Sequence, residues 1–443
     1  MSNKRVGFLT LGCKVNQYES AAIAEKLEEN GFTICDFSSP CDYYVINTCT
    51  VTGEADRKSR QMIRRARKNN PSAKILVTGC LAQIKGDKLF DIEGVYSIVG
   101  TRNKMMVADK ITALEKGDEA KTLDVPALCN KPFEEMKLCG NFGGTTEERT
   151  RAYIKIEDGC DSNCTYCIIP KARGSICSKA PETVIEEVKN LVKKGYLEVV
   201  LTGIETGSYG KDFDNKYTLA DLLCEVDKIE GLERIRLGSL DPSIMKKDFV
   251  EKISGLKKLT PHFHLSLQSG SDKILALMKR KYNTKMFSDA VENIRRHIDG
   301  VMFTTDIICG FPGETDEDFA DTVEFVKKAK FLSAHIFAYS KRDGTPAATM
   351  DNQVPASVAS ERVNKLYGVV NETAKDLLLE LDGRITTVIP EEYKNGFATG
   401  HTPNFANVNI ECEEKDYDNI HGKVVTVKLS VNDGAVFGQI MEK

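Results

Sequence analysis

The stretch Cys160-Asp-Ser-Asn-Cys164-Thr-Tyr-Cys167 places three thiols in one short loop, directly after an apolar run at residues 153–156. A loop this short can turn all three sulfurs towards a single metal centre. Thiolates hold iron–sulfur clusters, and a 4Fe–4S cluster has four irons to ligate. Three thiolates would leave one iron with an open position, as a catalytic site requires. The sequence therefore predicts an iron–sulfur cluster at this loop, and these three cysteines are called the barrel triad below.

A zinc knuckle built on Cys164 and Cys167 is the alternative for this loop. Structural zinc normally needs a second pair of Cys or His ligands at a matching spacing. The chain has no second C-x2-C pair, and no His lies near this one. The spacing therefore favours the cluster over zinc.

Length and composition indicate a soluble globular protein. The chain has 443 residues, of which 41% are hydrophobic and 28% charged, and this is long enough for two or three domains. No apolar run approaches the ~18 residues of a membrane helix, and no secretory segment is recognisable, so a cytoplasmic location is expected. Fourteen cysteines in such a chain indicate a reducing compartment, where clustered thiols bind metal more often than they form disulfides. The net charge of −4 means that any nucleic-acid site must be a local basic patch.

Residues 1–116 alternate apolar runs with helical patterns, which predicts an open parallel α/β sheet. Cys13, Cys49 and Cys80 each fall just past the end of one predicted strand. Ligands bind at the carboxyl ends of the strands in such sheets, so three distant thiols could converge there on a second cluster. The alternative is three unrelated buried thiols, because free cysteine is commonly buried. These three residues are called the auxiliary triad below.

The remaining eight cysteines form no spaced group. They are interpreted as structural, and they are Cys35, Cys41, Cys129, Cys139, Cys177, Cys224, Cys309 and Cys412. Residues 117–148 carry charges, prolines and a Gly143-Gly144 pair, which indicates a linker with an edge strand.

Residues 149–382 repeat strand then helix six times and end in a long helix. The predicted strands are residues 153–156, 198–203, 234–240, 262–268, 301–310 and 334–339. Six such units predict a partial (β/α)6 barrel with its chemistry on the loops after the strands. The residues expected at these loops to bind a cofactor are Gly203, Glu205, Ser239, Gln268, Asp306, Gly310 and Glu314. Residues 383–443 show short alternating stretches that predict a small, OB-like β-barrel.

With both triads in view, the whole chain resembles the radical S-adenosylmethionine (SAM) methylthiotransferases, whose terminal barrel is called TRAM. Leu11-Gly-Cys13, Asn47-Thr-Cys49 and Thr78-Gly-Cys80 look like that family's auxiliary-cluster ligands, and the barrel triad with Phe311-Pro-Gly-Glu-Thr315 looks like its radical SAM elements. The resemblance implies two 4Fe–4S clusters and SAM as both radical source and methyl donor. It also implies an electron donor such as flavodoxin or ferredoxin, and a sulfur source.

Within that family, Lys14-Val15-Asn16 after Cys13 is most similar to the branch that acts on N6-threonylcarbamoyladenosine at position 37 of tRNA. The resemblance then implies a 2-methylthio product. Isopentenyladenosine in tRNA and a ribosomal-protein aspartate are the alternative substrates. A non-catalytic iron–sulfur protein that binds RNA and senses redox state is the alternative of another class.

A basic segment at residues 53–69 follows Cys49 and is the candidate tRNA contact, with a solvated helix face as the alternative. Its candidate residues are Arg57, Arg60, Arg64, Arg65 and Arg67, beside Lys58 and Lys68. The threonylcarbamoyl arm carries a carboxylate, so a cation is expected near the barrel mouth. Arg342, after the sixth strand, is the candidate for it. The terminal barrel, with six Lys/Arg and nine Asp/Glu from residue 384 onwards, is acidic instead.

Overall fold

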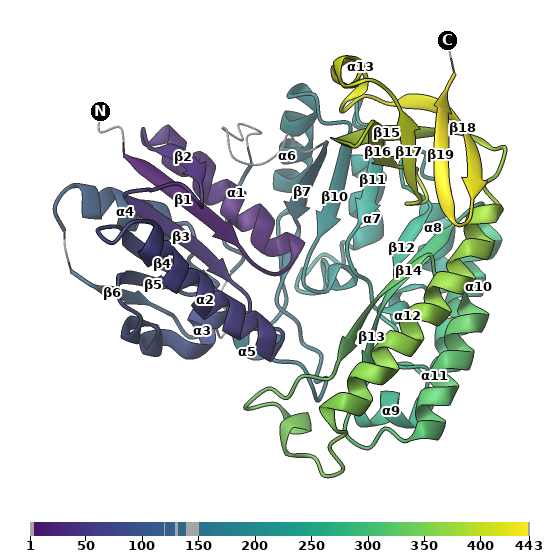
Figure 1. The fold of residues 1–443 in the computed structure, drawn as a ribbon, viewed down its shortest axis with the longest axis horizontal. Coiled ribbons are helices and arrows are strands. Elements are labelled where there is room, and N and C mark those ends of the chain that lie inside the picture. Colours follow the sequence, from purple (N-terminus) through teal and green to yellow (C-terminus); the bar gives the residue numbers. More distant parts are fainter. Residues whose placement is uncertain (1–3, 119, 129–131, 139–149, 442–443) are drawn as a thin grey trace.

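The computed structural model describes residues 4–118, 120–128, 132–138 and 150–441, which fold into a parallel sheet, a central half-open barrel and a small closed barrel (Figure 1). Cys129, Cys139 and the Gly143-Gly144 pair lie outside the described residues. In the described part, no helix is both long enough and apolar enough to span a membrane.

The N-terminal sheet has six parallel strands in the order β2-β1-β3-β4-β5-β6. The strands are β1 (Arg5–Thr10), β2 (Thr33–Asp36), β3 (Tyr43–Thr48), β4 (Lys74–Gly79), β5 (Val95–Val99) and β6 (Thr122–Asp124). The helices are α1 (Lys14–Glu29), α2 (Gly53–Asn69), α3 (Cys80–Lys85) and α4 (Met106–Glu115), with a 3-10 turn, η1, at Gly86–Asp91.

Helices cover both faces of this sheet. Ile23 of α1 and Ile111 of α4 pack in one apolar core, and Ile63 of α2 and Leu81 of α3 pack in the other. Every residue of β3 is buried, as expected for a central parallel strand with both faces covered. The predicted open parallel α/β sheet is confirmed.

The central unit has six parallel strands in two three-stranded sheets, β11-β10-β7 and β12-β13-β14. They are β7 (Arg151–Lys155), β10 (Glu198–Thr202), β11 (Arg234–Leu237), β12 (His262–His264), β13 (Met302–Cys309) and β14 (Ser333–Ala338). A parallel bridge between Leu240 and Leu265 joins the two sheets into one curved wall. The predicted six-stranded, partial barrel is confirmed.

Most helices of the central unit cover the outside of this wall. The helices of this unit are α5 (Ile169–Arg173), α6 (Pro181–Lys193), α7 (Leu219–Val226), α8 (Lys247–Ser254), α9 (Asp272–Leu277), α10 (Thr284–His297), α11 (Asp316–Ala329) and α12 (Ala356–Leu379). Helix α5 differs from the others, because it packs on α3 of the N-terminal unit. Short 3-10 turns are η2 (Thr206–Ser208), η3 (Pro242–Ile244) and η4 (Pro346–Thr349), and β8 (Glu157–Asp158) pairs with β9 (Cys177–Ser178) in a small ladder that the sequence did not predict.

Strands β11 and β12 end three to four residues earlier than predicted. Gln268, expected within the fourth strand, has a φ of +66°, in the left-handed region that a regular strand does not use. The chain therefore leaves regular pairing before this loop, although its backbone still donates from Gln268 N to Asp306 O at 2.8 Å.

The C-terminal unit is a closed five-stranded barrel, as predicted. It consists of β15 (Ile385–Lys394), β16 (Phe397–His401), β17 (Asn407–Glu411), β18 (Val425–Asn432) and β19 (Ala435–Ile440), with α13 (Glu414–Ile420) between β17 and β18. Arg234, the first residue of β11, donates to the carbonyl oxygens of His401 and Thr387 at 3.0 Å each. The small barrel therefore sits at the amino ends of the central strands, away from the loops that follow them (Figure 1).

Helix α1 belongs to two units at once. It covers the N-terminal sheet and also packs on β7, so that Tyr18 and Ala22 lie in the core of the central barrel. Met136 and Leu138, from the segment predicted as a linker, are buried in the same core. The N-terminal sheet is thus held firmly beside the open edge of the barrel.

Candidate functional site

The auxiliary triad lies at the carboxyl ends of three neighbouring strands. Cys13 follows β1, Cys49 follows β3 directly, and Cys80 opens α3 directly after β4. The thiol of Cys49 is electrostatically coupled to the thiols of both Cys13 and Cys80. A β-carbon on Gly12 would lie 3.0 Å from Cys49 Sγ. The structure therefore brings these three distant cysteines together at one edge of the sheet.

Two buried asparagines tie the first two loops together, and Gly79 packs the third loop against the second. Asn16 donates to the carbonyl oxygens of Leu11 at 2.7 Å and Thr48 at 3.1 Å, which joins the first loop to the second. Asn47 donates to the carbonyl oxygen of Asn16 at 2.9 Å. Gly79, with a φ of +97°, passes so close that a β-carbon there would lie 2.4 Å from Thr48 O. Sequence reasoning missed both asparagine roles, because Asn near a strand end is usually only a turn residue.

Burial raises the pKa of two of the auxiliary thiols, Cys13 and Cys49, in the metal-free chain. It raises the pKa of Cys49 to about 11, although the backbone N–H of Val51 acts in the opposite direction. It also raises the pKa of Cys13, against the lowering effect of the Arg173 guanidinium. Metal ligation requires thiolates, so loading a cluster here would release protons.

The barrel triad lies on the loop between β8 and α5, and each of its sulfurs accepts one N–H. Ser162 N donates to Cys160 Sγ at 3.4 Å, and Ile169 N donates to Cys167 Sγ at 3.4 Å. Arg280 Nη1 donates to Cys164 Sγ at 3.1 Å. Hydrogen bonds to sulfur favour its charged form, and they oppose the burial that raises the pKa of Cys167 to about 12.

These donor sets fit iron–sulfur clusters. Each set is three thiols and lacks the fourth ligand that closes a structural zinc site. Among the described residues, no three Cys, His, Asp or Glu side chains lie close enough to ligate one metal ion together. Sulfurs around a single zinc at ~2.3 Å would lie about 4 Å apart, whereas a four-iron cluster takes one thiolate per iron and spaces them more widely.

The predicted cofactor residues of the second strand lie next to the barrel triad. Glu157, which sequence reasoning missed, accepts at 2.9 Å from the backbone N–H of Glu205. Burial raises the pKa of Glu205 to about 7, and the nearby Asp241 adds to the rise. Glu205 and Ser162 line a cavity of about 310 Å³ beside the loop. Glu205 is therefore placed to pair with a cationic group of a bound ligand.

The other predicted cofactor residues divide into two groups. Gly203 and the half-buried Ser239 follow their strands, and Asp306 lies midway along β13 with its carboxylate 3.1 Å from His264 Nε2. Glu314 is different, because it accepts from Gly310 N at 2.7 Å and from Arg362 Nη1 at 2.6 Å. Its carboxylate fixes the turn after β13, and the expectation that Glu314 contacts a cofactor stays a prediction.

The inner face of the second sheet offers accessible polar and aromatic groups. His335 pairs in register with Asp306, and Phe337 with Ile308, so these side chains point to the same face. His335 and Phe337 are exposed, while Phe303 on the outer face is fully buried. A substrate entering the open barrel would therefore meet this inner face.

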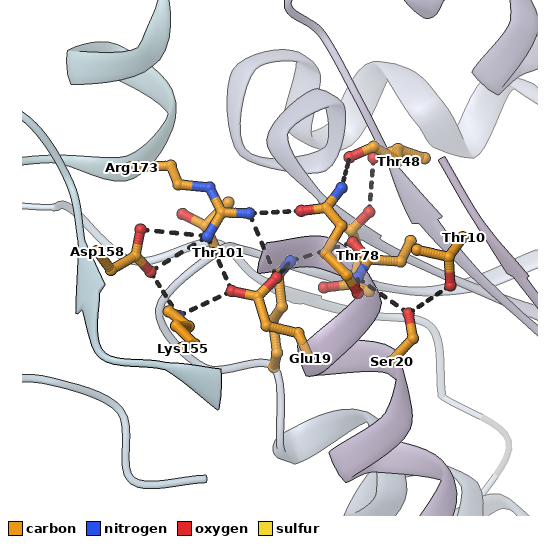
Figure 2. Close-up of polar contacts among 12 residues, drawn as sticks. Thr10, Glu19, Ser20, Thr48, Thr78, Thr101, Lys155, Asp158 and Arg173 are labelled. Atoms are coloured by element: carbon orange, nitrogen blue, oxygen red, sulfur yellow. Dashed lines mark hydrogen bonds and ion pairs between the residues drawn. The ribbon is translucent and has the colours of Figure 1, made fainter. Parts of the chain in front are cut away.

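A buried charge network joins α1, the helix that follows Cys13, to residues of the central unit (Figure 2). It consists of Glu19 on α1, Lys104 before α4, Lys155 on β7, Asp158 on β8 and Arg173 at the end of α5. These five side chains are at most 1% exposed.

Arg173 makes several of the contacts in this network. Its Nη1 lies 2.8 Å from Glu19 and 3.2 Å from Asp158, and its Nη2 donates to Asn16 at 2.5 Å. The side chain that ends α5, the helix after the barrel triad (Figure 2), therefore hydrogen-bonds to the asparagine that joins the first two auxiliary loops. Burial alone would raise the pKa of Glu19, but Arg173, Lys104 and Lys155 hold it well below its ordinary value.

The basic helix α2 starts beside Cys49 and turns its charges outwards. Arg64, Arg65, Lys58 and Lys68 are exposed, whereas Arg60 and Arg67 are half-buried. Two of the predicted tRNA contacts have carboxylate partners, since Arg57 pairs with Glu54 and Arg67 pairs with Glu93.

Arg342 lies on the loop after β14, the sixth strand, as predicted, and its guanidinium contacts residues of the N-terminal unit. Its Nη2 lies 3.1 Å from Asp56 and donates to Thr50 Oγ1 at 2.6 Å. The side chain is nearly buried between the barrel and α2. Arg342 therefore joins two units, and the expectation that it binds a substrate carboxylate stays a prediction.

Two family models match the chain. The model described as "Uncharacterized protein family UPF0004" matches residues 5–100, and the model described as "Radical SAM superfamily" matches residues 154–326. The first contains the auxiliary triad and the second contains the barrel triad.

Curated relatives match over almost the whole length. The threonylcarbamoyladenosine tRNA methylthiotransferase MtaB of Bacillus subtilis (strain 168) is 40% identical, with 96% of this chain and 93% of the relative covered. MtaB of Thermotoga maritima is 42% identical, over 86% and 84%. The tRNA-2-methylthio-N(6)-dimethylallyladenosine synthase of Lachnoclostridium phytofermentans is 36% identical, over 98% and 94%.

Solved structures share the fold at low sequence identity. The radical S-adenosylmethionine methyltransferase TsrM from Kitasatospora setae, with cobalamin and a 4Fe–4S cluster bound, matches with a TM-score of 0.58 and 16% identity, over 78% of this chain and 74% of that one. A sheet domain beside a partial barrel is thus an arrangement that known structures contain.

Proposed function

The chain belongs to the radical SAM tRNA methylthiotransferases, and from that premise we propose that it converts N6-threonylcarbamoyladenosine at position 37 of tRNA to its 2-methylthio derivative. The observation that carries the substrate is the 40% identity with the B. subtilis enzyme named for it, along 96% of this chain. The presence of both triads at strand ends supports the chemistry.

Radical chemistry suits this substrate. The C2–H of adenine has no usable acidity, so a general base or a polar nucleophile would not activate it. The barrel triad would hold one 4Fe–4S cluster with SAM at its open iron, and the auxiliary triad would hold the second. When bound, SAM and its cluster supply the radical, the second cluster supplies sulfur, and a second SAM supplies the methyl group.

The chain's own residues bind and orient these groups. The N–H groups of Ser162, Ile169 and Arg280 hold the barrel thiolates, and Glu205 lies beside them to meet SAM. The charge network fixes the auxiliary loops against α5, so the distance between the two triads is set by packed protein. The base has to leave the anticodon-loop stack to enter the barrel.

The partners follow from this reaction. The enzyme acts on tRNA in the cytoplasm, receives electrons from a donor such as flavodoxin or ferredoxin, and receives sulfur from a separate source. The exposed cations of α2 would hold the tRNA backbone beside the auxiliary triad.

The substrate is tested by competition. Reconstituted enzyme is offered equal amounts of tRNA bearing threonylcarbamoyladenosine and tRNA bearing isopentenyladenosine. The methylthiolated nucleosides are then quantified by mass spectrometry. A site built for a charged arm should prefer the first by at least ~100-fold, because the second leaves a protein cation unpaired. Preference for the isopentenyl substrate, or reaction with a ribosomal protein alone, would overturn the proposed substrate.

The basic helix makes a separate prediction. Replacing Arg64 and Arg65 with Ala should weaken tRNA binding similarly for all tRNA sequences and flatten its salt dependence by about 0.7–0.9 log units per lost phosphate contact. Binding is measured at several salt concentrations. Lys285→Ala, an exposed lysine on α10, is the control and should leave the slope unchanged. If the salt dependence of binding were unchanged in the double variant, Arg64 and Arg65 would belong to a solvated helix face without tRNA contact.

A further inference from the structure

Lys14 enters the central barrel from the N-terminal sheet. It opens α1 directly after Cys13, so its side chain starts at the auxiliary triad. Its Nζ lies 6.0 Å from the ring centroid of Tyr153 on β7, and it is electrostatically coupled to Arg236 on β11 and Asp306 on β13. The side chain is exposed, so a substrate that reaches the inner face of the barrel can touch it.

In the described part of the chain, no carboxylate forms an ion pair with Lys14. Other cations between the N-terminal sheet and the central barrel do have carboxylate partners. Lys155 and Arg173 pair with Glu19, and Arg342 pairs with Asp56. Lys14 lies near an aromatic ring instead, and two arginines and two carboxylates, Glu198 and Asp306, lie within electrostatic range of it.

The surroundings of Lys14 favour an incoming anion. Arg151 and Arg236 are the strongest charged neighbours of Lys14, ahead of Glu198 and Asp306. Arg236 is 1% exposed, and its Nη2 has no hydrogen-bond partner among the described residues. An anion here would therefore gain contacts with cations that the protein leaves incompletely paired.

We propose that Lys14 binds the carboxylate of the threonylcarbamoyl arm and so determines the substrate preference. The inference rests on the proposed function and deepens it. The arm is attached to the adenine that must lie between the two triads, and Lys14 is adjacent to one of them. A charged arm gains an ion pair in a water-poor site, whereas an uncharged arm leaves Lys14 without a partner. Arg236 is the second donor that the carboxylate could reach.

The test uses two anticodon stem-loops that differ in one charge. One carries threonylcarbamoyladenosine with its free carboxylate, and the other carries the methyl ester. Unaltered enzyme should prefer the acid over the ester in kcat/KM by about 10- to 100-fold. Lys14→Met keeps the length of the side chain and removes its charge, so it should abolish this preference by lowering kcat/KM for the acid alone. Lys14→Arg should retain most of it.

Controls separate this role from damage to the neighbouring triad. Lys26→Met changes an exposed lysine at the other end of α1 and should keep the full preference. Iron content and SAM cleavage without tRNA should be unchanged in Lys14→Met, because the ligands of both triads remain.

Three results would contradict the proposal. An unaltered acid-to-ester ratio in Lys14→Met would overturn it. So would a raised KM for SAM at an unaltered ratio, because Lys14 would then serve the cofactor. A loss of iron in both Lys14 variants would give Lys14 a structural role. If unaltered enzyme modifies neither stem-loop but accepts isopentenyladenosine, the proposed function fails instead, which keeps the two ideas distinguishable.

Discussion

Replacing the auxiliary triad, Cys13, Cys49 and Cys80, with alanine is expected to abolish methylthiolation while SAM cleavage to 5′-deoxyadenosine continues. Cleavage needs the open iron held by the barrel triad, whose ligands and N–H donors remain in this variant. Iron should fall by half, from about eight per chain to about four, if each triad holds a four-iron cluster. Iron analysis, chromatography of 5′-deoxyadenosine and nucleoside mass spectrometry provide the three readouts.

The reciprocal variant sharpens this expectation. Replacing Cys160, Cys164 and Cys167 should abolish both cleavage and methylthiolation, because the iron that binds SAM is lost. A variant with Cys35, Cys224 and Cys412 replaced, three half-buried cysteines outside the triads, is the matched control and should keep both activities. Loss of cleavage in a folded auxiliary-triad variant would contradict the division of labour, and full iron content there would contradict the second cluster.

Glu19→Gln is expected to destabilise the folded protein by about 3–5 kcal/mol, the usual effect of removing one partner from a buried ion pair. The substitution keeps the shape of the side chain and leaves Lys104, Lys155 and Arg173 with Asp158 as their remaining anion in the network. The network joins two units, so methylthiolation should fall even where the protein stays folded. Thermal unfolding of the metal-free protein is measured alongside activity.

Glu29→Gln is the matched control for this substitution. Glu29 is the last residue of the same helix, and its exposed pair with Lys26 is of the kind that contributes little to stability. Equal unfolding temperatures for Glu19→Gln and Glu29→Gln would show that the charge network does not hold the two units together.

The type of sheet and the types of barrel could be predicted because each depends on local patterns. Short apolar runs such as β3, with Gly or Asn at their ends, predict buried parallel strands, and Thr315 with Asp318 forms the capping box that starts α11. The positions of the triads after their strands also follow from the pattern. The rule that ligands bind at carboxyl ends then brings the three distant cysteines to one edge.

The connections between the units could not be predicted. Glu19 and Asn16 sit on a helix that would normally turn such residues to water, but α1 is covered by the barrel on that face, so both are buried. Arg342 illustrates the same limit, because its partner Asp56 lies 286 positions earlier in the chain. The neighbours of Lys14 lie on β7, β11 and β13, which are far from it in the sequence, so they became known only from the structure.

The segment predicted as a linker gives a further example. Its charges and prolines predicted a linker with an edge strand, and β6 is that strand at the edge of the N-terminal sheet. The burial of Met136 and Leu138 in the core under α1 was not predicted. Two apolar residues in a charged stretch carry no periodicity, so their burial depends entirely on the surfaces that meet there.

The central claim is that this chain adds a methylthio group to threonylcarbamoyladenosine in tRNA with both triads. Mass analysis of tRNA nucleosides tests it most directly, in a host without this activity that expresses either the unaltered chain or the auxiliary-triad variant. We predict that 2-methylthio-N6-threonylcarbamoyladenosine accumulates with the unaltered chain and is absent with the variant. Its absence with iron-loaded unaltered protein, or a methylthio group on isopentenyladenosine in its place, would contradict the account.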